Sequence, residues 1–374
     1  MVLILRLAFI LSIFFHPAIM FPSSPRMPSP WLRGFVWKSL SMLSTSACGI
    51  HQNTGIYVIS ITFFFGIGGS SMRRDALSRL RAWKTSPHRK PLILKGVRQC
   101  GKTWLLKAFG AEAYEAIAYF NFDEQPELKE FFETTKDTGR LLQNLSFAIG
   151  FPIKPGSTLV IFDEIQECNA ALNSLKYFHE NAPEYHIACA GSLLGVALSR
   201  PRAFPVGQVD FIELAPMSFM EFLSANGDDA LRAYADGIGA IEPVPELFAS
   251  QLTEKLRMYF VTGGFPEAVR AWAEDRDVGR VQEVLLGLLD AYERDFARHT
   301  DPSMFPKLSL IWRSIPSQLA KDNKKFLYKA VREGSRAREY EDALHWLRNA
   351  GLIRLTRRVS KPGLPLSAYE DAGA

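Results

Sequence analysis

The feature that most constrains the fold is a glycine-bounded loop that joins a short apolar run to a helical pattern. Residues 91–95 predict a buried strand, and residues 102–109 predict a helix. The loop has the spacing Gly, four residues, Gly, Lys, Thr. Its residues are Gly96, Val97, Arg98, Gln99, Cys100, Gly101, Lys102 and Thr103. This spacing between a strand and a helix is typical of a phosphate-binding loop, or P-loop.

Each position in this loop has a chemical reason. Gly96 and Gly101 allow the backbone to turn so that its amides converge on phosphate oxygens. The helix that follows adds the positive end of its dipole. Lys102 supplies a charge between the β- and γ-phosphates, and Thr103 offers a hydroxyl to magnesium. We therefore expect ATP and Mg²⁺ as cofactors. Cys100, beside a lysine at a helix N-terminus, is either a redox-sensitive thiol or a small loop residue.

A second apolar strand carries the acidic partners of such a loop. Residues 158–162 are followed directly by Asp163 and Glu164, which is the Walker B arrangement. Asp163 would hold the magnesium with Thr103, and Glu164 would orient the attacking water. An Asp-Glu turn after a strand is common by itself, so the pair gains its meaning from the P-loop before it.

The order of elements predicts the fold class. Apolar strands at residues 91–95, 116–122, 157–162, 186–190 and 209–214 alternate with helical patterns. This alternation predicts an α/β fold in which a parallel sheet is covered by helices on both faces. Beyond Pro216 the pattern becomes mainly helical.

Several stretches together resemble a known family, the prokaryotic AAA-type ATPases with a C-terminal domain of unknown function. The matching stretches are residues 96–103, 161–166, 190–192, 204–207, 214–222 and 263–269. The resemblance runs from about Met72 to the end. It implies a P-loop ATPase domain, a helical region, a winged helix and usually a nuclease-like domain. Since the sequence ends at Ala374, the resemblance leads us to expect a C-terminally truncated winged-helix-like region without the nuclease-like domain.

The resemblance also suggests sensor residues. It implies that Ser192, after the fourth strand, senses the γ-phosphate and acts with Lys102 and Glu164 in catalysis; a turn or helix cap is the alternative. The family tends to have Arg or Lys after the glycine at position 207, where this chain has Gln208. Arg200 and Arg202 are either donors to a neighbouring subunit's γ-phosphate or solvated loop residues.

The C-terminal region is basic. Its cations are Lys324, Lys325, Lys329, Arg332, Arg336, Arg338, Arg348, Arg354, Arg357, Arg358 and Lys361. Residues 326–331 and 337–350 predict helices, and residues 352–359 predict a strand. This order fits a partial winged helix, which binds either DNA or protein. Three acids on the second helix, Glu339, Glu341 and Asp342, oppose DNA contact. We divide the chain into an ATPase domain (72–225), a helical region (226–300) and a winged-helix-like region (301–374).

Residues 1–71 form an uncertain extension with two apolar runs. They are a signal or anchor, a native extension, or translated sequence upstream of a true start at Met72; we favour the last. No stable membrane association is expected for residues 72–374. Cys48, Cys100, Cys168 and Cys189 are too widely spaced for a disulfide framework or a metal pattern, which indicates a reducing, cytoplasmic setting.

The sequence thus predicts an ATPase that couples Mg-ATP hydrolysis to an unidentified partner or movement. The alternatives are a DNA- or protein-binding regulator that uses ATP as a switch without significant turnover, and a non-functional fragment. The formal net charge of +5 over 374 residues is too small to identify a nucleic-acid partner. Whether the chain forms a homo-oligomer is left open.

Overall fold

The computed structural model describes residues 72–191, 207–239, 242–321, 326–332, 336–361 and 363–370. The expectations for residues 1–71 lie outside this part of the chain. The first half of the described chain forms a five-stranded parallel sheet in the order β2-β3-β4-β1-β5. The strands are β1 (Leu92–Lys95), β2 (Ala116–Asn121), β3 (Thr158–Asp163), β4 (His186–Gly191) and β5 (Asp210–Glu213). The predicted α/β fold with a parallel sheet is confirmed.

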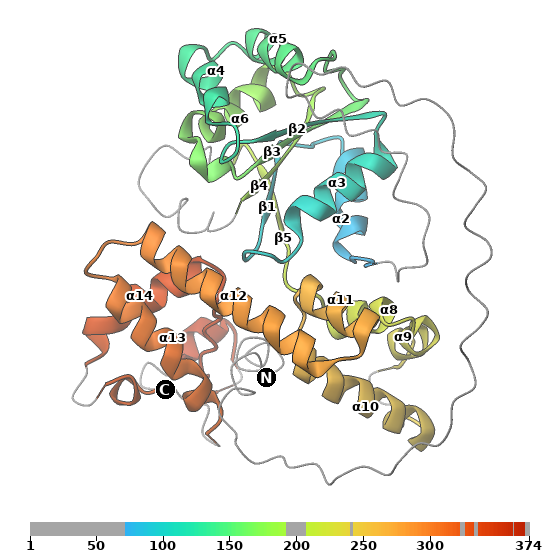
Figure 1. Ribbon diagram of the computed structural model, residues 1–374, viewed down its shortest axis with the longest axis vertical. Coiled ribbons are helices and arrows are strands. Elements are labelled where there is room, and N and C mark those ends of the chain that lie inside the picture. The colour runs from blue at the N-terminus through green and yellow to red at the C-terminus, as the bar shows by residue number, and fades with distance from the viewer. Residues whose placement is uncertain are drawn as a thin grey trace, which may run out of the picture. The chain divides into compact units, whose positions relative to one another are not determined.

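Helices cover both faces of this sheet (Figure 1). They are α2 (Ala76–Thr85), α3 (Lys102–Ala113), α4 (Lys129–Thr134), α5 (Thr138–Ile149) and α6 (Asn169–Asn181). Side chains alternate along each strand, so Leu159 and Ile161 of β3 join the core with α2 and α3. Val160 and Phe162 join the core with α4, α5 and α6 on the opposite face. This double burial explains why the strands are apolar runs rather than alternating patterns.

Strand β1 lies inside the sheet, between β4 and β5. Its register places Lys95 beside Gly191 of β4 and beside Glu213 of β5. The chain leaves β1 for the far edge at β2, returns through β3 and β4, and then crosses to β5. The strand order therefore reverses around β1, and ligands of open α/β sheets bind at such a reversal, beyond the carboxyl ends of the strands.

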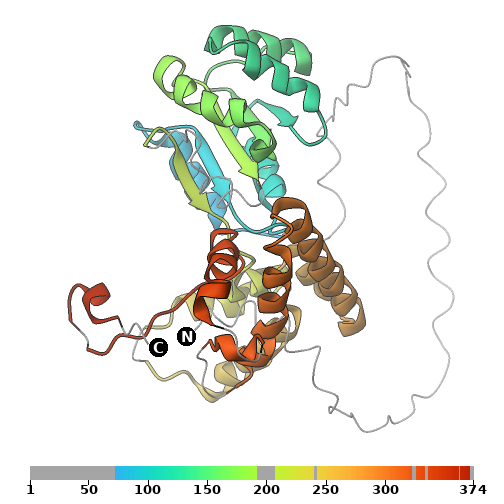
Figure 2. The same ribbon diagram turned by 90° about the vertical axis from the view of Figure 1, so that its left-hand side faces the viewer.

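The second half of the described chain is helical (Figures 1 and 2). Its helices are α8 (Phe219–Ala225), α9 (Asp229–Asp236), α10 (Glu246–Thr262), α11 (Pro266–Asp275), α12 (Val278–His299), α13 (Phe305–Leu319) and α14 (Ala337–Asn349). The core that contains α2 and α3 continues into α12, α13 and α14 through buried residues such as Tyr292, Trp312 and Leu347. The P-loop side of the sheet and these helices thus share buried apolar contacts.

Two predicted elements of the C-terminal region are not formed. Residues 326–331 contain only a short 3₁₀ turn, Tyr328–Ala330, and residues 352–359 form no strand. Val359 makes an isolated antiparallel bridge to Glu370 instead. Residues 352–359 have a suitable pattern, but a strand also needs a neighbour to complete its backbone hydrogen bonds. The helix-helix-strand order on which the winged-helix prediction rested is absent from the described residues.

Within the ranges that the structure describes, every helix is either too short or too polar to cross a lipid bilayer.

Candidate nucleotide-binding site

The backbone of the P-loop explains its two glycines. A Cβ atom at Gly96 would lie 2.4 Å from the Leu214 carbonyl oxygen, so no larger residue fits. Gly101 has φ +91°, in the left-handed region that favours glycine, and it directly precedes α3. Gln99 also has a positive φ of 59°. The loop therefore forms a tight concave turn before a helix N-terminus, as a phosphate site requires.

Lys102 and Thr103 are the first residues of α3; Lys102 contacts the loop, and Thr103 contacts the end of β3. The Lys102 ammonium donates hydrogen bonds to the carbonyls of Gly96 and Val97, at 3.0 and 2.8 Å. The Thr103 hydroxyl donates to Oδ2 of Asp163 at 2.7 Å. The structure thus brings the P-loop and the end of β3 together, as predicted from sequence.

Asp163 has a second partner that the sequence analysis missed. The Tyr119 hydroxyl, from β2, donates to the same Oδ2 atom at 2.9 Å. Burial and the Asp163 carboxylate both raise the pKa of Tyr119, so the phenol keeps its proton. The Lys107 ammonium lies 3.6 Å from the centre of the Tyr119 ring, on its face. The only sequence signal for this role is a tyrosine on the strand that pairs with β3.

Glu164 follows Asp163 in an unusual backbone conformation. Its φ of 47° lies in the left-handed region, which is costly for a residue with a side chain and is frequent at functional sites. Its amide donates to Oδ1 of Asp163 at 3.0 Å, and its carboxylate accepts a hydrogen bond from the Gln166 side chain. Asp163 therefore accepts hydrogen bonds on both oxygens, and Glu164 is turned out of the strand direction.

Cys100 is a buried loop residue. Its side chain is fully buried, and its thiol lies 3.5 Å from the Leu214 carbonyl oxygen. Burial raises the pKa of the Cys100 thiol, although Lys102 and Arg74 act in the opposite direction. Of the two interpretations of this cysteine, the structure supports the small loop residue, because reactive thiols need exposure and a lowered pKa.

The P-loop is also connected to α12, which the sequence did not indicate. The Arg98 guanidinium forms an ion pair with Asp295, with Nη1 and Oδ1 2.5 Å apart. The Tyr292 hydroxyl, one turn earlier on α12, donates to the Arg98 carbonyl at 2.9 Å. Arg98 was expected to contact nucleotide as part of the loop, and the structure shows that its side chain binds the helical region.

These residues fit Mg-ATP. Magnesium is usually held by one or two protein oxygen ligands together with phosphates and water, and Thr103 with Asp163 forms such a set. No group of three or more His, Cys, Asp or Glu side chains that could hold a metal by itself occurs in the described ranges. The Thr103 and Asp163 oxygens would therefore hold a magnesium ion only together with phosphate and water oxygens.

Three predicted sensor residues lie outside the described residues: Ser192, Arg200 and Arg202. Gly191, directly before Ser192, is the last residue of β4 and pairs with Lys95 next to the P-loop. Gln208 is described and lies at the start of the segment that leads into β5.

The five-stranded parallel sheet, its flanking helices and the loop between β1 and α3 have the architecture of a P-loop α/β fold. Residues 88–223 match a family described as an AAA domain. Residues 253–373 match a second family, described as a domain of unknown function, DUF8612. Two successive parts of the chain are therefore similar to an AAA domain and to a domain of unknown function. No curated protein matches its sequence.

Solved structures give distant similarities. AMPPCP-bound DnaA from Aquifex aeolicus is 13% identical, with a TM-score of 0.32 over 77% of this chain and 89% of that one. The ORC1 protein from Aeropyrum pernix in complex with DNA is 16% identical, with a TM-score of 0.31 over 80% and 87%. PCH-2 from C. elegans is 13% identical, with a TM-score of 0.31 over 58% and 68%.

Proposed function

We propose that this chain binds Mg-ATP in the P-loop and hydrolyses it, and that the bound nucleotide alters how the C-terminal helices pack. The observation that carries the proposal is the 2.7 Å hydrogen bond between Thr103 and Asp163. It joins the phosphate-binding loop to the acidic end of β3, where a magnesium ion would bridge protein and phosphate. Such an enzyme belongs in the cytoplasm, where ATP is supplied.

The proposed roles follow from position. The loop amides and Lys102 would bind the phosphates, and Thr103 and Asp163 would hold magnesium. The metal would neutralise phosphate charge. Glu164 would accept a proton from the attacking water or orient it. Ser192 would contact the γ-phosphate.

The route from nucleotide to helices runs through Arg98. Its side chain and its carbonyl are both bound by α12, through Asp295 and Tyr292. A shift of the loop on phosphate binding would therefore act directly on α12. Hydrogen exchange of α12 with and without ATP, in wild type and in Lys102→Ala, tests this step; exchange that ATP leaves unchanged in wild type contradicts it.

Two substitutions in the full chain test the enzymatic proposal. Lys102→Ala should abolish binding of a fluorescent ATP analogue, whereas Lys176→Ala, on the surface of α6, should not change it. Glu164→Gln should keep binding and lose roughly 100-fold or more in phosphate release, because a general base contributes on that order. Glu167→Gln is its matched control.

The results distinguish the two classes of function. Loss of turnover in Glu164→Gln identifies an ATPase. Tight binding without phosphate release, unchanged by that substitution, identifies a switch that uses ATP without turnover. Unchanged ATP affinity in Lys102→Ala would refute the site itself. Of the basic residues in the tail, Arg354 and Arg357 form exposed ion pairs with Glu213 and Glu370, so the positive charge of these two is partly balanced.

A further inference from the structure

A buried arginine before the first described helix contacts the P-loop at a backbone carbonyl. Arg74 is 4% exposed and pairs with Glu221, which is 5% exposed and lies 147 positions away in sequence. Arginine is rarely buried to this degree unless it is fully paired. Neither residue belongs to the P-loop or to the acidic pair, so the ATP site described above does not account for them.

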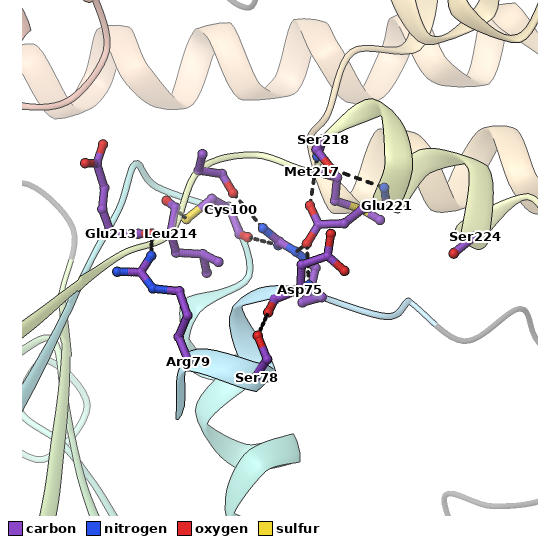
Figure 3. A network of polar contacts seen from close by, with 12 residues as sticks. Asp75, Ser78, Arg79, Cys100, Glu213, Leu214, Met217, Ser218, Glu221 and Ser224 are labelled. Carbon is purple, nitrogen blue, oxygen red and sulfur yellow. Dashed lines mark hydrogen bonds and ion pairs between the residues drawn. The ribbon is translucent and has the colours of Figure 1, made fainter. Parts of the chain in front are cut away.

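The guanidinium of Arg74 binds three partners from two segments, the P-loop and residues 214–222. Nε donates to Oε1 of Glu221 at 3.0 Å, Nη1 donates to the Cys100 carbonyl at 2.7 Å, and Nη2 donates to the Ala215 carbonyl at 2.6 Å. The planar fork of an arginine suits this task, because its donors leave in fixed directions. Figure 3 shows Cys100 and Glu221 converging on this network.

Glu221 is itself held in place. Its Oε1 atom also accepts from the Asp75 amide at 2.7 Å, and its Oε2 atom accepts from the Ser218 amide at 2.8 Å. With Ser218 it forms the capping box that starts α8 (Figure 3). Since two amides fix the carboxylate, it holds the Nε end of the guanidinium in place.

The contact with Cys100 matters because of peptide geometry. In a planar trans peptide, the carbonyl of one residue and the amide N–H of the next point in opposite directions. A carbonyl of Cys100 held toward Arg74 therefore turns the Gly101 amide away from Arg74. Gly101 is the last loop residue before Lys102, and its amide belongs to the set expected to bind phosphate.

We propose that Arg74 is a positioning residue for phosphate binding: it orients the Gly101 amide through the Cys100 carbonyl, and Glu221 holds it in that position. The inference rests on the proposed ATP site and extends it. It also gives a role to the segment at residues 214–222, which supplies Ala215, Ser218 and Glu221.

The simpler alternative is that the ion pair of Arg74 and Glu221 only stabilises the fold by joining the start of α2 to α8; we call this role a structural staple. Buried ion pairs can often be replaced by apolar side chains with little loss of stability, so a staple alone does not require this pair. A staple predicts lower thermal stability with unchanged affinity of the folded protein for nucleotide. A positioning residue predicts weaker phosphate binding even where the protein is fully folded.

The test is a titration of the full chain with a fluorescent ATP analogue and Mg²⁺, well below the unfolding temperature of each variant. Arg74→Met should raise the Kd about tenfold, the size expected when a hydrogen-bonding group loses its orientation. Inorganic tripolyphosphate, used as a competitor, should weaken by the same factor, because the lost contact is with phosphate. Arg79→Met is the matched control, since Arg79 lies exposed on α2, and it should leave both affinities unchanged.

Each outcome decides the matter. An Arg74→Met protein that binds both ligands within about twofold of wild type, a change below 1 kcal/mol, refutes the positioning role. Should that variant not fold, Arg74→Lys decides in its place. The three donors of an ammonium leave a single nitrogen and cannot reproduce the spread of Nε, Nη1 and Nη2, so weaker tripolyphosphate binding supports the proposal and wild-type binding overturns it. A wild-type chain that binds no ATP refutes the proposed function instead, which keeps the two failures distinct.

Discussion

The Arg98 guanidinium and the Asp295 carboxylate lie 2.5 Å apart and join the P-loop to α12, but the two residues differ in exposure. The side chain of Arg98 is 44% exposed, and that of Asp295 is 7% exposed. The second carboxylate oxygen of Asp295 is buried and has no hydrogen-bond partner among the described residues. Asp295 therefore depends on Arg98 for its charge balance, whereas Arg98 retains contact with water.

This asymmetry predicts unequal effects of removing either partner. Arg98→Met should lower the free energy of unfolding by about 3 kcal/mol, because it leaves a buried carboxylate without a counter-charge. Asp295→Asn should lower it by about 1 kcal/mol, since the remaining arginine is partly solvated. Urea unfolding of the full chain measures both. Equal losses, or a larger loss in Asp295→Asn, would contradict the reasoning, and the double variant should be more stable than Arg98→Met alone.

The hydrogen bond from Tyr119 to Asp163 predicts that its removal weakens magnesium-dependent nucleotide binding, while the protein still folds. Tyr119→Phe removes one of the two donors to Oδ2, so the carboxylate is less well oriented. The Mg²⁺ concentration for half-maximal binding of the fluorescent ATP analogue should rise about tenfold. The unfolding free energy should change by about 1 kcal/mol.

Tyr177→Phe provides the control for this experiment, because Tyr177 lies partly exposed on α6. It should keep the wild-type magnesium dependence. A Tyr119→Phe protein with the magnesium dependence of wild type would show that Thr103 and the Glu164 amide orient Asp163 without help.

The parts of the site that could be predicted from the sequence are those marked by a pattern within one short segment. The P-loop is one continuous segment, and the acidic pair follows directly from a strand, so spacing and apolar runs identified both. Tyr119 could not be found in this way. Its role depends on the pairing of β2 with β3, in which Tyr119 lies opposite Ile161, and register is set by tertiary packing.

The contacts between the P-loop and distant segments could not be predicted either, because they too depend on tertiary packing. Arg98 and Asp295 are 197 positions apart, and Arg74 and Glu221 are 147 apart. No periodicity connects residues at such separations. The strand predicted at residues 352–359 is not formed for the opposite reason: its local pattern is suitable, but no strand of the described residues pairs with it.

Burial of Cys100 predicts a thiol that does not react in the native protein. Burial raises its pKa, so the thiolate is scarce at neutral pH and reagents have no access to it. Iodoacetamide at pH 7.5 should leave Cys100 unmodified for hours in the folded chain and alkylate it readily in urea, as measured peptide by peptide with mass spectrometry. Rapid labelling of the folded protein, or loss of ATP binding after mild peroxide treatment that Cys100→Ala prevents, would restore the redox interpretation.

His186, the first residue of β4, predicts a pH dependence of stability. Its Nδ1 atom lies 2.8 Å from the Tyr114 hydroxyl and accepts a hydrogen bond from it in the neutral tautomer that carries its proton on Nε2. Burial, together with the cations Arg89 and Lys84, lowers the pKa of His186 to about 4. The unfolded chain has the ordinary value of about 6.5. Between these two values the unfolded state binds a proton that the folded state does not.

The unfolding free energy should therefore be unaffected by His186 above pH 6.5 and should fall as the pH drops from 6.5 toward 4, by up to about 1.4 kcal/mol per pH unit. Acidic side chains also titrate near the lower end of this range, so the comparison needs a variant. His186→Asn keeps a hydrogen-bond acceptor for Tyr114 but does not titrate. Urea unfolding at several pH values should give a steeper loss for wild type than for the variant between pH 6.5 and 4.5. Parallel curves would mean that the folded protein protonates His186 as readily as the unfolded chain does.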